Sequence, residues 1–316
     1  MSNPAISATG LRKSYGDNVV LDGIDLDVAP GTVFSMLGPN GAGKTTTVNI
    51  LSTLVAPDAG TATVAGHDLA GDPDGIRGAI GLTGQFSAVD NLLTGEENLF
   101  LMADLHHLPR REGRRRAAEL LDRFDLTDAA KKTPTTYSGG MRRKLDLAMT
   151  LVGDPEVIFL DEPTTGLDPR SRRTMWAIIR DLVANGVTIF LTTQYLDEAD
   201  ELADRIAVLD GGRLVAQGTP EELKRRVPGG HLQLRFPDTG ALHRATLAFG
   251  ESTKDEENLA LRVPTDGSVS ALRAVLDRLD ADAVAVDSLT VHTPDLDDVF
   301  LSLTGHRTEA TKELAK

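Results

Sequence analysis

The chain has 316 residues, 41% hydrophobic and 25% charged, which is the balance of an ordinary globular protein with room for two domains. Its 33 basic and 47 acidic residues give a net charge of −14, which argues against a general nucleic-acid binder because such a protein needs a basic face. The absence of cysteine excludes disulfides and thiolate metal sites, and no apolar run approaches the roughly 18 residues of a membrane span. The N-terminus lacks the pattern of a signal peptide, and the absence of cysteine leads us to expect a cytosolic location.

The first segment, residues 3–36, predicts short strands separated by turns. Val19–Leu21 and Ile24–Val28 are rich in β-prone residues, and an Asp-Gly pair stands between them. Tyr15 is expected in a turn before these strands. Another strand, Val33–Leu37, leads directly into the glycine-rich loop that follows it.

This loop has the pattern G-x-x-x-x-G-K-T, which indicates a phosphate-binding loop between a strand and a helix. Glycines allow successive backbone N–H groups to face an anion, and the helix from Thr45 to Ser52 adds the positive end of its dipole. Lys44 is expected to reach the β- and γ-phosphates, and the Thr45 hydroxyl to bind Mg²⁺. The candidate nucleotide-binding residues are Gly38, Pro39, Asn40, Gly41, Ala42, Gly43, Lys44, Thr45 and Thr46.

Residues 85–155 are predicted to form a helical insert. Thr94 and Glu97 have the spacing of a capping box, and the helix that they open is expected to reach about Leu108. Further helices are expected around Ala117–Phe124 and after Gly140. The five arginines within residues 110–116 form either a solvated helix face or a contact with anionic lipid or a membrane subunit.

Two buried strands of a parallel sheet are predicted at Val157–Leu160 and Val187–Leu191, joined by a helix from about Pro169 to Asn185. The first strand ends in Asp161 and Glu162, and ligands of such sheets lie at the carboxyl ends of strands. Asp161 is therefore a candidate Mg²⁺ ligand, and Glu162 a candidate base that polarises the attacking water. Alternatively, these two acids cap the following helix.

A small C-terminal α/β domain is predicted at residues 228–305, after an ATPase domain at 1–227 and before a flexible tail at 306–316. Its predicted strands are Leu232–Phe236, Leu259–Val263 and Val284–Val291, with a helix around Val269–Leu279. Its last helix is expected to begin with Thr293 as N-cap and Pro294 at the first helical position.

Several motifs in one order resemble the ATPases of ABC transporters. Tyr137-Ser138-Gly139-Gly140-Met141 is similar to their signature loop, Gln85 to the glutamine after a strand, and Gly166-Leu167-Asp168 to the loop after the second acid. With Tyr15 as the N-terminal aromatic, the resemblance spans about residues 5–225. It implies an α/β fold with a parallel-sheet core, an N-terminal antiparallel β subdomain and the helical insert.

The resemblance also implies roles for these residues. Tyr15 would stack on adenine, Gln85 would contact Mg²⁺ or water and sense the membrane partner, and Asp168 would order the opposite protomer. Ser138, Gly139 and Gly140 would face the γ-phosphate of ATP bound to that protomer, which implies a head-to-tail dimer with two sandwiched ATP molecules. A helix N-terminus with a hydroxyl and free N–H groups suits that role.

Two departures from the family pattern concern catalysis. Met141 stands where the signature has glutamine, and Tyr137 where it has leucine. Gln194 stands where the family has a histidine beside the γ-phosphate, and an amide cannot carry that charge. We expect ATP binding to survive and hydrolysis to be slow, so a slow-cycling, nucleotide-gated binding module is the alternative to an efficient motor. A translation or DNA-repair protein of this family is disfavoured. The resemblance implies two ATPase cassettes for the first type and a long coiled coil for the second, whereas this chain has one phosphate-binding loop and no heptad run.

The tail segment LDDVFLSLTG, residues 296–305, resembles the end of the daunorubicin-resistance type of these ATPases, as does Gln194 within its segment. That resemblance implies an ATPase subunit that powers export of a hydrophobic drug or lipid. The permease would be a separate membrane subunit, and the chain would lie on the cytoplasmic face of the membrane as a peripheral protein. The pocket for the exported molecule would lie in that separate subunit.

Overall fold

The computed structural model describes residues 3–84, 88–226, 230–265, 268–292 and 294–305. These residues form two compact units, one ending at Pro220 and the other beginning at Glu221. The predicted boundary at 227/228 and the predicted tail at 306–316 lie outside the described residues. Among the described residues, no helix is both long and apolar enough to cross a bilayer.

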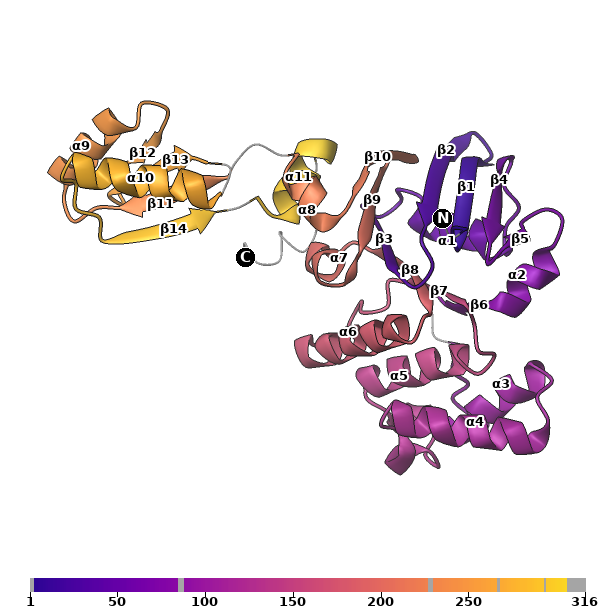
Figure 1. Cartoon of the computed structure of the whole chain (residues 1–316). Coiled ribbons are helices and arrows are strands. Elements are labelled where there is room, and N and C mark those ends of the chain that lie inside the picture. The colour runs from indigo at the N-terminus through magenta and orange to yellow at the C-terminus, as the bar shows by residue number, and fades with distance from the viewer. Residues whose placement is uncertain (1–2, 85–87, 227–229, 266–267, 293, 306–316) are drawn as a thin grey trace. The chain divides into compact units, whose positions relative to one another are not determined.

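The first unit begins with an antiparallel sheet in the strand order β2-β1-β4-β5 (Figure 1). Two of the turn predictions here are wrong. Tyr15 is the last residue of β1 and pairs with Asn18, and β2 continues through Asp22-Gly23, because Gly23 at φ +81° is accommodated by a register shift against β1. The strands are β1 (Ile6–Tyr15), β2 (Asn18–Val28), β4 (Ala59–Val64) and β5 (His67–Asp68).

The central sheet of this unit has the order β10-β9-β3-β8-β7-β6, and only β10 runs antiparallel to its neighbour. Every residue of β3, β7 and β8 is buried, as expected for a sheet covered on both faces. The Phe190 ring lies 5.4 Å from that of Phe34 and 5.5 Å from that of Phe159. The strands are β3 (Val33–Leu37), β6 (Ile80–Thr83), β7 (Val157–Asp161), β8 (Thr188–Thr193), β9 (Arg205–Asp210) and β10 (Arg213–Gly218).

The predicted helical insert is confirmed as α3, α4 and α5, which lie together in Figure 1 with α6 beside α5. Thr94 and Glu97 form the predicted capping box, and the helix that they open ends at Leu105. The helices of the first unit are α1 (Lys44–Leu51), α2 (Pro73–Ala79), α3 (Gly95–Leu105), α4 (Arg110–Arg123), α5 (Gly139–Thr150), α6 (Pro169–Ala184) and α7 (Leu196–Leu202), with 3₁₀ turns at Thr127–Ala129 and Pro134–Thr136.

The second unit contains an antiparallel sheet in the order β12-β13-β11-β14. Its apolar core joins β11 and β13 to the buried faces of α9 and α10, with Phe236 and Leu261 at its centre. The elements are α8 (Pro220–Lys224), β11 (His231–Arg235), α9 (Thr239–Ala248), β12 (Thr253–Asp255), β13 (Ala260–Pro264), α10 (Val269–Ala281), β14 (Ser288–His292) and α11 (Leu296–Thr304).

Two predictions for the second unit are corrected. The strand expected from Val284 begins only at Ser288, because the Val284 N–H bonds to the Leu279 carbonyl and closes helix α10. Helix α11 is capped by Asp295 and not by Thr293, which lies outside the described residues. Asp295 and Asp298 form a reciprocal capping box, with 2.9 Å from the Asp298 nitrogen to Asp295 Oδ1.

Candidate nucleotide-binding and catalytic site

The glycine-rich loop connects buried strand β3 to helix α1, as the motif predicts. Gly43 is the N-cap of α1 with φ +111°, a conformation that side chains rarely adopt. A Cβ atom there would lie 2.6 Å from Leu21 Cδ2 and 2.8 Å from the Val20 carbonyl oxygen. The loop is thus packed tightly against β2, which requires glycine at this position.

Lys44 lies at the centre of the site and is 5% exposed. Its Nζ donates to the carbonyls of Gly38 at 2.7 Å and Pro39 at 3.1 Å, and it lies 3.8 Å from Glu162 Oε1. Burial lowers the pKa of Lys44, and the nearby carboxylates of Glu162 and Asp161 oppose that shift. An ammonium group is therefore fixed between the loop and the acids that follow β7.

Asp161, the last residue of β7, is buried and accepts two hydroxyl hydrogen bonds. Thr45 Oγ1 donates to its Oδ2 at 2.9 Å, and Thr192 Oγ1, from neighbouring strand β8, donates to its Oδ1. A hydroxyl beside a carboxylate is the oxygen pair that Mg²⁺ prefers, so these residues fit the predicted ion. No cluster of three or more His, Asp or Glu side chains suited to a metal occurs in the described part of the chain. Mg²⁺ commonly takes its remaining ligands from phosphates and water.

Glu162 has a backbone conformation that is uncommon for a residue with a side chain, with φ +51°. Its N–H bonds to Thr192, at 3.1 Å from the carbonyl oxygen and 3.2 Å from Oγ1, and its Oε2 accepts from Thr165 Oγ1 at 3.3 Å. The alternative that the acid pair caps the next helix is wrong, because the N-cap of α6 is Asp168.

The signature segment forms a second group of predicted residues. Ser138 is the N-cap of α5, with its Oγ 3.2 Å from the Met141 nitrogen. A Cβ atom on Gly140 would lie 2.6 Å from Ser171 Oγ, so the beginnings of α5 and α6 are in close contact. Asp168 caps α6 through the Ser171 nitrogen at 3.0 Å and Oγ at 2.6 Å, and these bonds lower its pKa.

The two departures in the signature segment fill the helical core. The Tyr137 hydroxyl donates to the Ala129 carbonyl at 2.7 Å, and its ring is buried. Met141 packs against the same apolar cluster as Tyr137. Both residues therefore have packing roles, independent of any contact with nucleotide.

The remaining predicted residues are Gln194, Tyr15 and Gln85. Gln194 directly follows β8, two residues beyond the Thr192 that pairs with Asp161, and is partly exposed. Tyr15 is 50% exposed, and its ring centroid lies 5.6 Å from Lys13 Nζ. Gln85 falls outside the described residues, so its predicted role stays a prediction.

Two buried residues of the site region were missed from the sequence. Thr192 bonds to both acids, as described above. Glu198, on α7, is fully buried, and its Oε1 accepts from Thr164 Oγ1 at 2.7 Å and Trp176 Nε1 at 3.1 Å. Burial raises the pKa of Glu198. Nothing in the acidic segment around it distinguishes this one carboxylate from its exposed neighbours, so only the alignment of β7, β8 and α7 identifies it.

Known proteins with similar sequences or folds agree with this geometry. The ABC transporter family model matches residues 21–165. The daunorubicin resistance ATP-binding protein DrrA2 of Streptomyces coeruleorubidus is 51% identical over 99% of this chain and 98% of its own length. The daunorubicin/doxorubicin resistance ATP-binding protein DrrA of Streptomyces peucetius is 47% identical over 99% of this chain and 96% of its own.

A solved ATP-binding subunit of an ABC transporter has a similar fold over most of this chain. It is 29% identical, with a TM-score of 0.64, and the match covers 70% of this chain and 92% of that one. The expected α/β fold, with a parallel-sheet core and antiparallel sheets, is confirmed. The chain belongs to the family of ABC transporter ATP-binding proteins of the daunorubicin-resistance type, and it is a subunit that binds and hydrolyses ATP.

Proposed function

We propose that the chain powers export of a hydrophobic drug or lipid through a separate membrane subunit. The convergence of Lys44, Thr45, Asp161 and Glu162 at the carboxyl edge of the central sheet carries this proposal. The names of the relatives indicate the substrate class, since the resistance that they name concerns daunorubicin and doxorubicin. The chain would act at the cytoplasmic face of the membrane, held there by the permease.

In the proposed cycle, the loop of residues 38–46, including Lys44, would bind the phosphates, while Thr45 and Asp161 would hold Mg²⁺. Mg²⁺ would neutralise developing charge on the phosphate oxygens. Glu162 accepts the proton of the attacking water, and Gln194 orients that water through its amide. Tyr15 is free to stack on adenine, because half of its surface is exposed.

The second group of residues is proposed to act on ATP bound to another copy of the chain. Ser138 and the exposed N-terminus of α5 lie on the surface, and Asp168 is exposed beside them. In a head-to-tail dimer, this surface would close over the loop of the partner. ATP would then favour the dimer, and hydrolysis would favour its opening.

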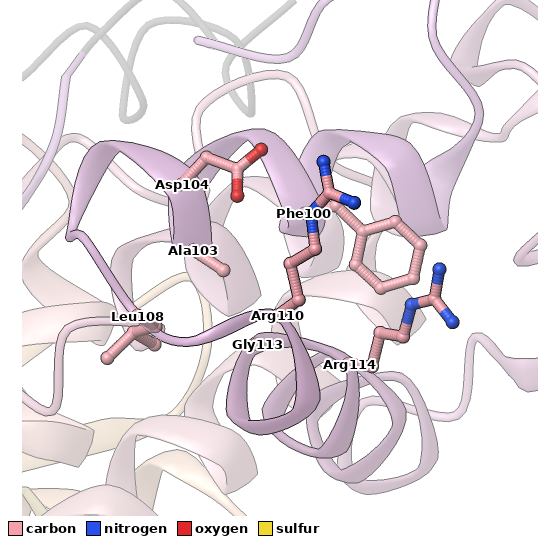
Figure 2. Close-up of a pocket in the computed structure, with 7 residues that line it drawn as sticks. All are labelled: Phe100, Ala103, Asp104, Leu108, Arg110, Gly113 and Arg114. Carbon is pink, nitrogen blue, oxygen red and sulfur yellow. The ribbon is translucent and has the colours of Figure 1, made fainter.

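The groove between α3 and α4 is the surface that we propose for the permease (Figure 2). It is a cavity of about 140 Å³ lined by Phe100, Leu108, Arg110 and Arg114, with Asp104 at its edge. Among the described residues, no ion pair engages either of these two arginines, whereas Arg115 pairs with Glu112 and Glu119. An apolar side chain beside a carboxylate on a cytoplasmic segment of the permease would fit this groove.

The first experiment is phosphate release from the full chain with Mg-ATP, with Glu162→Gln as the blank. We expect turnover that this substitution abolishes, and ATP-dependent dimers of the Glu162→Gln variant on size exclusion. A variant that stays monomeric with ATP would contradict the proposed cycle.

The slow-cycling alternative is tested by Gln194→His in the same assay. Tight ATP binding without turnover in the wild type, and turnover gained in Gln194→His, would favour the gated module over the motor. Equal, clear turnover in both proteins would favour the motor.

A further inference from the structure

One buried arginine joins the signature helix to the backbone around the catalytic acids. Arg143 is one turn beyond Gly140 on α5, and its side chain is 11% exposed. Its guanidinium donates from Nε to the Pro163 carbonyl at 2.8 Å and from Nη2 to the Asp161 carbonyl at 3.3 Å. These two carbonyls lie on either side of Glu162.

The same guanidinium also contacts the chain next to the predicted glutamine segment. Nη1 donates to the Gly84 carbonyl at 3.1 Å and to Asp146 Oδ2 at 3.2 Å. Asp146, 4% exposed, accepts from the Ala88 nitrogen at 3.1 Å through its other oxygen. The pair of Arg143 and Asp146, here called the α5 clasp, thus bonds to the residues that precede 85 and follow 87.

The energetics of this pair indicate a specific arrangement. Burying a charged pair is costly unless the geometry is good and further hydrogen bonds satisfy both groups. Here every bond of the guanidinium goes to a carboxylate or to a backbone carbonyl of another segment. Lysine could keep the charge beside Asp146, but its single nitrogen lacks the planar set of donors that reaches separate carbonyls.

The clasp acts on a peptide that is already held by strand β8. Glu162 has φ +51°, and its N–H is held by Thr192 of β8. The Arg143 bonds fix the flanking carbonyls from α5. A rotation or shift of α5 would therefore be transmitted to the carboxylate that follows β7.

We infer that Arg143, held by Asp146, is a positioning residue that couples the orientation of the signature helix to Glu162 and so sets the rate of hydrolysis. The inference rests on the proposed role of Glu162. It does not require Arg143 to touch nucleotide, and its effect is on kcat and not on ATP affinity. Misplacement of a reacting group by about 1 Å can cost on the order of a hundredfold in rate.

The test compares Arg143→Gln, Arg143→Lys and Asp146→Asn with Arg142→Gln as the matched control. Arg142 is the preceding arginine on α5, and its Nη1 donates to Asn91 Oδ1 at 2.7 Å, away from the strand ends. For each protein, kcat and KM for phosphate release are measured together with the Kd of a fluorescent ATP analogue and the melting temperature.

We expect Arg143→Gln to lower kcat by about tenfold or more, with KM and Kd within about threefold of wild type. Arg143→Lys recovers little of this loss, Asp146→Asn gives a smaller loss, and the double variant Arg143→Gln/Asp146→Asn loses less than the two single effects combined. Arg142→Gln retains the kcat of wild type.

A folded Arg143→Gln or Arg143→Lys protein with the kcat of wild type would overturn the inference. A loss of Kd in parallel with kcat would do the same, since that pattern indicates general damage to the site. Should Arg143→Gln fail to fold, Arg143→Lys decides, because it keeps the buried charge. Failure of the proposed function is distinct: the wild type would then release no phosphate, or Glu162→Gln would release it equally.

Discussion

The two compact units differ in whether they bury polar side chains. Among the described residues, every buried polar or charged side chain lies between Ser35 and Glu198, in the first unit. The second unit has an apolar core of leucine, valine, alanine and phenylalanine side chains. Burying a polar group costs free energy unless the group is hydrogen-bonded. A cluster of such groups therefore indicates a functional site. The difference places the chemistry of the chain in its first unit.

Within the first unit, these polar groups concentrate where strands β7 and β8 end. Lys44, Asp161, Thr192 and Glu198 are all buried there. Their hydrogen bonds run between the loop, the two strands and α7, as given above. The second unit has charged residues mainly on its surface, where ion pairs such as Lys254–Glu256 contribute little.

The largest expected effect is on the cores. Phe190→Ala removes a ring that contacts two others in the central sheet, and Phe236→Ala removes a fully buried ring from the second unit. Each should cost about 3–5 kcal/mol in the free energy of unfolding, measured by urea titration. We expect Phe190→Ala to weaken ATP binding, while Phe236→Ala leaves the Kd for ATP unchanged. Loss of ATP binding in Phe236→Ala would show that the second core supports the site, and would break the comparison.

The next effect concerns a lysine in each unit. Lys44→Met removes the ammonium between the loop carbonyls and Glu162, and an ionic hydrogen bond of this kind is worth about 1.5–3 kcal/mol. The Kd for ATP should rise by about ten- to a hundredfold, measured by titration with a fluorescent analogue. Lys254→Met, which removes a surface ion pair of the second unit, is the control and should bind ATP as wild type does. Equal affinities in both variants would contradict the role of the loop.

A third effect separates catalysis from stability on one strand. Thr192→Val removes the hydroxyl that donates to Asp161 and accepts from the Glu162 nitrogen. Thr188→Val, at the other end of β8, removes the hydroxyl that accepts from the Gly31 nitrogen at 3.0 Å. Both should destabilise the protein by about 1–3 kcal/mol. Only Thr192→Val should also lower kcat, in the phosphate-release assay. A similar fall in both variants would mean that hydrolysis follows stability alone.

Much of the fold and of the candidate site in the first unit was predictable from the sequence. Three parts of the site are local motifs: the glycine-rich loop, the acids after β7 and the signature segment. Short apolar runs predicted the strands beside them, and a capping residue predicted a helix. The helical insert and the parallel strands were predicted because their apolar residues follow different patterns, a helical spacing in the insert and short continuous runs in the strands.

The missed features depend on contacts between segments far apart in the sequence. Thr192 and Glu198 gain their importance from the alignment of β7 with β8 and α7, which no local pattern encodes. The start of α11 was misplaced because proline and threonine gave one cap signal, while Asp295 and Asp298 gave a stronger one two residues later. Gly23 was interpreted as a turn because a glycine in a β-bulge has the same local signal.

The smallest effect is a difference in pH dependence between the two units. Burial raises the folded-state pKa of Glu198 above the ordinary 4.5, so the folded protein holds this proton more tightly than the unfolded chain. Its contribution to stability is fully present below about pH 4.5 and declines as the pH rises towards the folded-state pKa, by at most about 1.4 kcal/mol per pH unit.

Glu256, fully exposed in the second unit, has a pKa lowered by Lys254, so its contribution is lost as the pH falls. The free energy of unfolding, measured with urea at a series of pH values, should therefore fall less with rising pH in Glu198→Gln than in wild type. In Glu256→Gln it should fall less than in wild type as the pH is lowered. The Glu256 effect should also disappear in high salt, whereas that of Glu198 should persist, because salt screens only exposed charges efficiently. Identical pH profiles for Glu198→Gln and wild type would mean that folding leaves the pKa of this carboxyl unchanged.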